Sequence, residues 1–338
     1  MFELWIGEHK SPLKKNRKED NVMDTAFNYY FDDVPSLSYI SKRLFLDSGA
    51  YSAMRRNIEL TPERVLDVQE SLDPDLAVVL DYPFASGYST SLMQRLWKKT
   101  LENLKLWQES STLKEVVPVL HAWSFSSLEK NLMDLIKISD SDVVLLGSIV
   151  TEDISSSKAF FGDRQLNKNI IVALYSSVEF IRKESNYKIH LTGFGSSPLT
   201  LHLAYYMGVE SVDTAGQRRK AAYGKIVLPG TGEIYVSGRK AKFGRTVIKK
   251  NQKKLLEYCE CPICSTNPEL IYSDWRARAI HNEYVLKKEH QKARILMEEG
   301  EDVYEKYLDF LFANSGFRHI WRYLKRLKHY KRLDQLIR

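Results

Sequence analysis

Three cysteines stand close together in the second half of the chain, as Cys259, Cys261 and Cys264. Thiolates with this spacing suit a tetrahedral metal ion better than a disulfide framework, and zinc would take its fourth ligand from a nearby histidine. His281 and His290 are the first two histidines after the cysteines. Because three thiolates and one imidazole leave no coordination position for water, the sequence predicts a structural zinc site.

A second set of polar residues stands where short apolar runs end. Its members are three aspartates, one histidine and two glycines, namely Asp47, Asp81, Asp213, His121, Gly147 and Gly193. An aspartate directly after a strand is commonly a helix N-cap. Three aspartates and a histidine at equivalent positions fit a shared site better than they fit capping alone.

The apolar runs that precede these residues alternate with helical patterns. The predicted strands are 2–6, 44–47, 76–81, 116–120, 143–147, 189–193 and 209–213, and the predicted helices are 62–71, 91–108, 127–138, 170–184 and 198–207. Continuous apolar strands separated by helices predict a parallel sheet covered on both faces. With no G-x-G-x-x-G after a strand, the pattern favours an α/β fold of the closed (β/α)8 TIM-barrel type over a Rossmann sheet. The polar residues would then share the catalytic face of the barrel.

The pattern changes after residue 213. Glycines with alternating Val, Ile and Tyr predict a small β region at 224–250, with strands at 226–228, 234–237 and 246–248. Helical patterns follow at 272–299 and at 303–336, the second broken near 314–316. We therefore expect a TIM-barrel domain at 1–255 that includes the β region, a zinc-binding helical subdomain at 256–300 and a helical C-terminal extension at 301–338.

Positive charge is concentrated in two zones of a chain whose formal net charge is +7. Residues 318–338 hold eight Lys or Arg against one Asp, and residues 218–254 hold twelve against the single acid Glu233. A run of charge is usually a solvated face. Two such zones, the last containing Trp321, Tyr323 and Tyr330, make a polyanionic partner an equal alternative.

The composition limits the other classes of protein. A hydrophobic share of 43% and a charged share of 28% are ordinary globular values and exclude extensive disorder. The sequence contains no apolar run long enough to span a membrane and no signal-peptide core. Together with the clustered cysteines, these features predict a cytoplasmic protein with no membrane partner.

Taken in order, several short motifs resemble those of the tRNA-guanine transglycosylase superfamily, which comprises zinc-bearing TIM-barrel enzymes that exchange guanine for a 7-deazaguanine. The matching segments are D-S-G-A-Y at 47–51, L-D at 80–81, L-L-G-S at 145–148, H-L-T-G-F-G at 190–195, G-V-E-S-V-D at 208–213, R-R-K at 218–220 with Gly224, and the cysteine cluster with His281-Asn282. The resemblance therefore covers the chain from about residue 44 to residue 284.

The resemblance implies catalytic roles for two aspartates. Asp213 matches the family nucleophile, whose carboxylate would attack C1′ of the target nucleoside and leave a covalent glycosyl-enzyme. The incoming base would then attack the same carbon with net retention. Asp47 matches the residue that performs general acid and base work.

The resemblance also implies roles in binding. Asp81 would read the edge of the base, Tyr51 would stack on it, Gly147 and Ser148 would offer it backbone N–H groups, and His121 stands where the family usually has Gln. The nucleic acid would be held by Arg218, Arg219 and Lys220. The local pattern His281-Asn282 favours His281 over His290, so the implied ligands of the structural Zn²⁺ are Cys259, Cys261, Cys264 and His281.

Some positions differ from the tRNA-modifying members. Ala222 replaces a second recognition arginine, Gln217 replaces a proline and Tyr82 replaces a common Glu. With the basic end of the chain, these differences fit the DNA-modifying (DpdA-like) branch, which places 7-cyano-7-deazaguanine into DNA. The resemblance thus implies a DNA-guanine transglycosylase, a pentosyl-type glycosyltransferase that works with other proteins of a DNA-modification system. The same chemistry on tRNA, and a non-catalytic nucleic-acid-binding subunit, are the alternatives.

Overall fold

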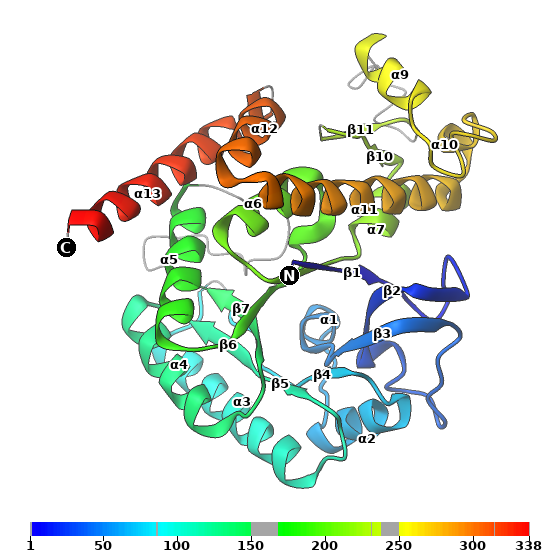
Figure 1. Cartoon of the computed structure of the whole chain (residues 1–338). Coiled ribbons are helices and arrows are strands. Elements are labelled where there is room, and N and C mark those ends of the chain that lie inside the picture. The colour runs from blue at the N-terminus through cyan, green and yellow to red at the C-terminus, as the bar shows by residue number, and fades with distance from the viewer. Residues whose placement is uncertain are drawn as a thin grey trace.

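The computed structural model describes residues 2–85, 87–149, 168–230, 232–237, 250–313 and 315–337 (Figure 1). One parallel sheet forms its centre, with the strand order β5-β4-β3-β2-β1-β9-β8-β7-β6. The strands are β1 (Glu3–Gly7), β2 (Asn16–Thr25), β3 (Ile40–Asp47), β4 (Leu76–Val78), β5 (Val116–Val117), β6 (Val119–Ala122), β7 (Val143–Ile149), β8 (Lys188–Leu191) and β9 (Ser211–Thr214).

The two ends of that sheet are halves of a single strand. Strands β5 and β6 are separated only by Pro118, which has no N–H to donate to a ladder. On one side the Val117 carbonyl accepts a hydrogen bond from Val79 of the β4 segment, at 3.1 Å, and on the other the Pro118 carbonyl accepts one from Leu145 of β7, at 3.0 Å. The sheet therefore closes on itself. Counting β5 and β6 together, the described strands form the predicted eight-stranded parallel barrel.

Helices follow the barrel strands, and α2 to α6 cover the outside of the barrel, whereas the short α1 lies over its middle in the view of Figure 1. The helices are α1 (Ala50–Arg56), α2 (Pro62–Leu72), α3 (Thr90–Ser110), α4 (Phe125–Ile138), α5 (Lys168–Glu184), α6 (Pro198–Met207) and α7 (Gly216–Ala222). Each of α2 to α6 lies within a few residues of its predicted range. In α4, for example, Leu128, Leu132 and Leu135 are buried at helical spacing, and Ser124 caps the first turn through a reciprocal bond with Ser127.

One strand was missing from the sequence prediction. Strand β2 has the sequence NRKEDNVMDT, which lacks the apolar run that identified the others. Its first half pairs with β3 only near Asn16 and Arg17, before a register shift, and Arg17 is buried among acids instead of apolar side chains. The predicted strand at 76–81 also ends early, at Val78, so Asp81 lies in the loop that follows β4. The predicted strand at 246–248 lies outside the described residues.

The segments after the barrel form a second, smaller unit. Strands β10 (Lys225–Val227) and β11 (Glu233–Tyr235) pair antiparallel, and α9 (Lys250–Glu257), α10 (Leu270–Ser273) and the long helix α11 (Trp275–Glu299) follow. A small core of Ile226, Leu228, Ile234, Leu256 and Ile271 joins the two strands to the cysteine segment. The sequence prediction assigned residues 224–250 to the barrel domain. In the described part of that range, Ile226, Leu228 and Ile234 belong to the small core, whereas Val227 packs in the main core of the barrel.

Two further helices, α12 (Glu301–Ala313) and α13 (Arg318–Ile337), complete the chain and run along the outside of the molecule (Figure 1). Helix α12 packs on α6 and α11, and α13 packs on α12 and α5. Among the described helices, none combines the length and the apolar character that crossing a bilayer requires.

Candidate active site and metal centre

Three carboxylates meet at the C-terminal ends of the barrel strands. Asp47 is the last residue of β3, Asp213 lies in β9, and Asp81 follows β4. Burial, together with the negative charges of Asp81 and Asp213, raises the pKa of Asp47 to about 7, although the Gly49 N–H and the Thr25 side chain bind its carboxyl group. The Gly49 nitrogen lies 3.0 Å from Asp47 Oδ2. A carboxyl with a pKa near neutrality can both give and take a proton under physiological conditions.

Asp213 is held on one side and open on the other. Its Oδ1 accepts a hydrogen bond from the Gly193 N–H at 2.6 Å, and no described residue donates to Oδ2. Gly193 has a φ of +77°, a left-handed conformation that favours glycine and that aims its N–H at the carboxylate. One oxygen of Asp213 is therefore anchored while the other is available for attack on a substrate.

A histidine that the sequence analysis gave no role lies beside this carboxylate. His190 of β8 is completely buried, and its Nε2 lies 3.4 Å from Asp213 Oδ1 without forming a hydrogen bond. Its Nδ1 is 2.9 Å from the Ser211 hydroxyl. The available signal was its place inside a predicted strand that ends at the rim.

His121 connects two other residues of the site. Its Nδ1 accepts the backbone N–H of Ser148 at 2.8 Å, so the proton of the neutral ring is on Nε2, which donates to Asp81 Oδ2 at 2.9 Å. A Cβ atom on Gly147 would come within 2.5 Å of the His121 ring, which explains the glycine there. Both ring nitrogens are thus engaged within the protein, and His121 orients Asp81. The contacts of His121 and of the Ser148 N–H with the base stay predictions.

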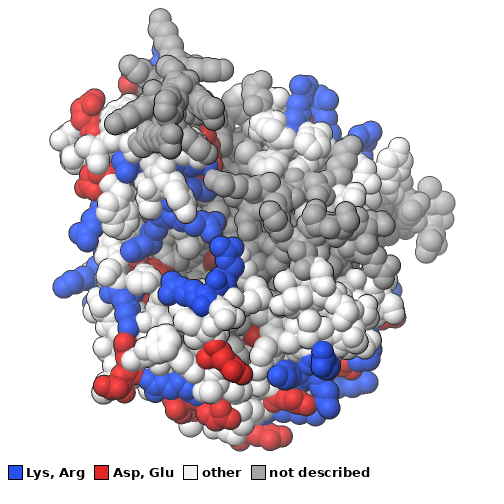
Figure 2. All heavy atoms as spheres, turned by 180° about the vertical axis from the view of Figure 1, so that it is seen from behind, with Lys and Arg blue, Asp and Glu red and all other residues white. Residues whose placement is uncertain are grey.

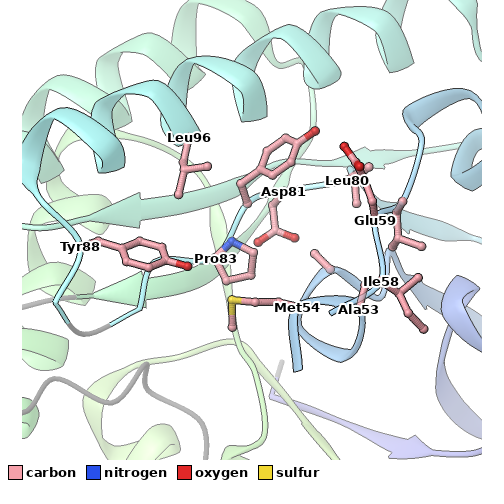
Figure 3. A pocket seen from close by; sticks show the side chains of 12 residues that line it. Ala53, Met54, Ile58, Glu59, Leu80, Asp81, Pro83, Tyr88 and Leu96 are labelled. Atoms are coloured by element: carbon pink, nitrogen blue, oxygen red, sulfur yellow. The ribbon is translucent and has the colours of Figure 1, made fainter. Parts of the chain in front are cut away.

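A cavity of about 220 Å³ opens beside Asp81 (Figure 3). Asp81 points into it, with Ala53 and Met54 of α1 on one side and Tyr88 and Leu96 on the other (Figure 3). Most of its lining residues are apolar, so Asp81 is a carboxylate in a largely apolar pocket. Tyr51, the predicted stacking residue, is partly buried on α1 but does not line this cavity.

The three predicted nucleic-acid-binding cations occupy different environments. Arg218 binds Glu8 and the Ser11 carbonyl, and Lys220 is buried and pairs with Glu233 at 2.6 Å. Arg219 is exposed and has no salt bridge or hydrogen bond to the side chain of any residue that the structure describes. Arg219 is therefore the member of this group best placed to meet a polymer. Figure 2 shows that Lys and Arg gather around a hollow on the face turned away in Figure 1.

The cysteines and His281 converge on one point. The Sγ atoms of Cys259, Cys261 and Cys264 lie 3.7, 3.4 and 3.4 Å from His281 Nδ1, and all four ligand atoms lie within 4.8 Å of one another. A tetrahedral ion with bonds of about 2.3 Å to sulfur and about 2.0 Å to nitrogen separates such atoms by about 3.5 Å. The other ring nitrogen, Nε2, lies 2.9 Å from the Val227 carbonyl, which fixes Nδ1 as the ligand atom. These four residues can therefore bind a metal ion.

His290, the alternative ligand, lies elsewhere, where its Nε2 donates to the Phe2 carbonyl at 3.0 Å. The residue after His281 has a positioning role instead. Asn282 accepts the Val227 N–H at 2.7 Å and donates to the carbonyls of Gln217 and Lys225. The metal-binding helix is thereby joined to α7, which follows Asp213.

A buried ionic group makes a second connection between α11 and the barrel. Arg17 of β2 binds Glu8 on one side and Glu283 of α11 on the other, and Glu8 also binds Arg218. The side chains of Arg17, Glu8 and Glu283 are almost fully buried. The sequence analysis did not find this group because its members are far apart in the chain.

The fold and the site together define a TIM barrel with carboxylates on its catalytic rim and a metal-binding subdomain after the last strand. The family model described as Queuine tRNA-ribosyltransferase matches residues 36–310, and the chain belongs to this family.

The curated relatives that the chain resembles include several tRNA-guanine(15) transglycosylases. It is 25% identical over 343 residues to the tRNA-guanine(15) transglycosylase of Saccharolobus solfataricus, a match that covers 95% of this chain and 62% of the relative. It is 25% identical to the enzyme of the same name from Pyrococcus abyssi, over 76% of this chain and 40% of the relative. The match to the Sulfolobus acidocaldarius enzyme is 24% identical and covers 88% and 57%. The chain thus spans between 40% and 62% of the length of these relatives.

Proposed function

We propose that this protein exchanges a guanine base in nucleic acid for a 7-deazaguanine through a covalent intermediate on Asp213. The observation that carries the proposal is the pair of carboxylates on one rim, Asp213 with an open oxygen and Asp47 with a pKa of about 7. Family membership and the names of the relatives support the same reaction class.

In the first half of the reaction, Asp213 attacks C1′ of the target nucleotide. The C1′–N9 bond breaks, its electron pair leaves with guanine, and protonated Asp47 supplies the proton that the departing base needs. In the second half, the ring nitrogen of the incoming base attacks C1′, its proton passes to Asp47, and the Asp213 carboxylate is released. Two inversions at C1′ give net retention.

Base recognition centres on Asp81. Its carboxylate accepts from the N–H groups of the base, while His121 and the Ser48 hydroxyl, 2.9 and 3.3 Å away, fix its orientation. The roles of Tyr51 as the stacking residue and of Gly147 as a backbone donor rest on the motif resemblance, because neither residue lines the cavity beside Asp81. Arg219, supported by Arg218 and Lys220, contacts the polymer next to the target nucleotide.

Zinc is the metal that the Cys3His donor set fits best. When bound, it would crosslink the cysteine segment to α11 through His281. His281 and Asn282 themselves hold α11 against β10 and α7, the helix that follows the nucleophile. The reaction needs no coordination position on the ion.

Two polymers are candidates, and each has an observation in its favour. The names of the relatives favour tRNA. Ala222, in place of a recognition arginine, favours DNA, for which the enzyme must extrude the target base from the stack or act on single strands. A stem-loop RNA offers a base that is already unstacked.

The test is nucleoside mass spectrometry on DNA and RNA from cells that express the protein, digested separately, with an Asp213→Asn strain alongside. We expect a 7-deazaguanine nucleoside in one of the two polymers, and its loss by at least about a thousandfold in the variant because the nucleophile is gone. The exposed Asp67→Asn serves as the matched control and should retain activity. Exchange that persists in Asp213→Asn would refute the nucleophile. A variant and a wild type that both bind nucleic acid without exchange would indicate the non-catalytic subunit instead.

A further inference from the structure

We propose that the outward arginine face of α13 is a second docking surface for the phosphate backbone of the nucleic-acid substrate, separate from the catalytic rim. This inference rests on the proposed function, because it names the surface that holds the polymer away from the target base. Three observations carry it, namely the pairing of the cations on α13, their spacing, and the groove that they line.

The cations on the inner side of α13 form salt bridges within the protein. Lys325 pairs with Glu305 and Asp309 of α12, at 3.2 and 2.9 Å, and Lys328 pairs with Glu301 at 2.9 Å. Buried Ile320, Trp321 and Leu324 lie on the same side. The lysines and the apolar residues of α13 therefore fix the helix to the body of the protein.

The outer side carries a different set of cations. Arg318, Arg322 and Arg326 are exposed, and no salt bridge joins any of them to a residue that the structure describes. The charge of Arg322 contributes to lowering the pKa of Asp309, but the Asp309 carboxylate is already hydrogen-bonded by Trp321 and Lys325. The positive charge of this outer side is therefore not neutralised within the described part of the protein.

The spacing and the type of these residues favour a polyanion. Positions four residues apart on a helix lie one above the other with a rise of about 6 Å, so the three arginines form a straight row. Guanidinium groups bind phosphate through paired N–H donors and hold their charge at any physiological pH. A row of this kind matches the repeated charges of a nucleic-acid strand.

A groove lies beside the row. It has a volume of about 640 Å³ and is lined by Arg322, Lys325, Arg326, His329 and Tyr330. Tyr330 is 67% exposed, so its ring is accessible from solvent. Cations that track a backbone, with an aromatic ring that can stack on a base, are the two components of sequence-independent strand binding. Figure 1 shows that α13 runs along the outside of the molecule beside α5.

The experiment uses the full chain and two fluorescent probes, a 20-base-pair DNA duplex and a stem-loop RNA of equal length. Dissociation constants of wild type and of Arg322→Ala/Arg326→Ala are measured over a series of salt concentrations. We expect the slope of log K against log salt to become shallower by about 1.4 to 1.8, because two phosphate contacts are lost. Affinity at low salt should fall about tenfold for the probe that is the true substrate class.

Two further variants sharpen the result. Lys98→Ala/Lys105→Ala removes the same charge from exposed positions of α3 and should leave the slope unchanged. Arg322→Lys/Arg326→Lys keeps the charge and should recover most of the slope. In a base-exchange assay the alanine pair should raise KM and leave kcat unchanged, which separates this surface from the Asp213 chemistry.

An unchanged slope with both probes overturns the inference and leaves the proposed function standing. An equal loss in the α3 control also overturns it, because the effect would then come from net charge alone. Binding to an acidic protein or to anionic vesicles that depends on Arg322 and Arg326, without any change towards either nucleic acid, would assign the surface to another partner.

Discussion

The catalytic rim and the cysteine cluster differ in how their buried polar groups interact. On the rim, like charges are close together, and the pKa of Asp47 is raised to about 7 by burial and by Asp81 and Asp213. In the cluster, the four ligand atoms face one point, and the second nitrogen of His281 is satisfied by the Val227 carbonyl. The cluster is complementary to a cation that would neutralise it, whereas the rim retains unfavourable interactions.

This difference separates a structural site from a reactive one. A cluster whose donors are all directed at one ion gains stability when the ion binds. A rim whose carboxylates repel one another loses stability, and in return it holds a group that can exchange protons near neutral pH. The comparison therefore predicts that mutation lowers the free energy of unfolding in the cluster and raises it on the rim.

The largest expected effect on stability is the loss of the metal. Cys261 is fully buried, so Cys261→Ser should remove a ligand, release the zinc and lower the free energy of unfolding by about 4 kcal/mol or more. Thermal unfolding with and without a chelator, alongside metal analysis, measures this. Ser265→Ala, at an exposed neighbouring position, is the control. Identical unfolding of wild type, chelated protein and Cys261→Ser would contradict a structural metal.

Replacing Asp47 is expected to stabilise the protein instead. Because its pKa is higher in the folded protein than the usual 3.8, the folded state binds the proton more tightly between about pH 4 and pH 7. Wild-type stability should therefore fall as pH rises through this window and should level off above it. Asp47→Asn should remove that dependence and raise the free energy of unfolding at about pH 8 by about 3 kcal/mol, while abolishing exchange.

Denaturant titrations at several pH values measure this effect. The control is Asp67→Asn on the exposed face of α2, which should keep the wild-type pH dependence. If Asp47→Asn destabilised the protein at about pH 8, the carboxylates of the rim would not be in conflict and the comparison would fail.

His121 provides a smaller test of how the rim is organised. His121→Gln can place an amide N–H where Nε2 donates to Asp81, but its carbonyl oxygen does not overlay Nδ1. The Ser148 N–H then loses its acceptor, so Asp81 should be held less firmly. We expect KM for the incoming base to rise about tenfold with little change in melting temperature. His319→Gln, at an exposed position of α13, should change neither quantity. A fall in melting temperature with an unaltered KM would show that His121 serves packing alone.

The rim could be predicted from the sequence because its carboxylates follow local apolar runs, and the cluster because its three thiolates are adjacent in the chain. The ion pairs that hold the neighbouring elements together could not be predicted. Arg218 binds Glu8 and Arg17 binds Glu283, pairs that only the folded chain brings together. Strand β2 was missed for a related reason, since its polar residues are paired with distant acids and carry no periodic apolar signal.

His190 gives the last and smallest test, because one of its ring nitrogens has a hydrogen-bond partner and the other does not. Its Nδ1 has a partner in Ser211, and its buried Nε2, without a hydrogen bond, faces Asp213 Oδ1 at 3.4 Å. His190→Phe keeps the ring volume and the edge contact with Phe45, whose centroid lies 4.9 Å away, and removes only the polar atoms. If the imidazole helps to position the nucleophile, kcat should fall about threefold to tenfold with KM unchanged.

Structural and functional roles predict different results for that variant. A packing role alone predicts a changed melting temperature and an unchanged kcat. Phe180→Leu, at a partly buried ring contact outside the rim, calibrates the loss that packing causes. Because Asp213 is already anchored by the Gly193 N–H, the contribution of His190 must be the smaller of the two. A loss as large as that of Asp213→Asn would mean that the imidazole itself takes part in the chemistry, and that the rim has one more reactive group than its three carboxylates.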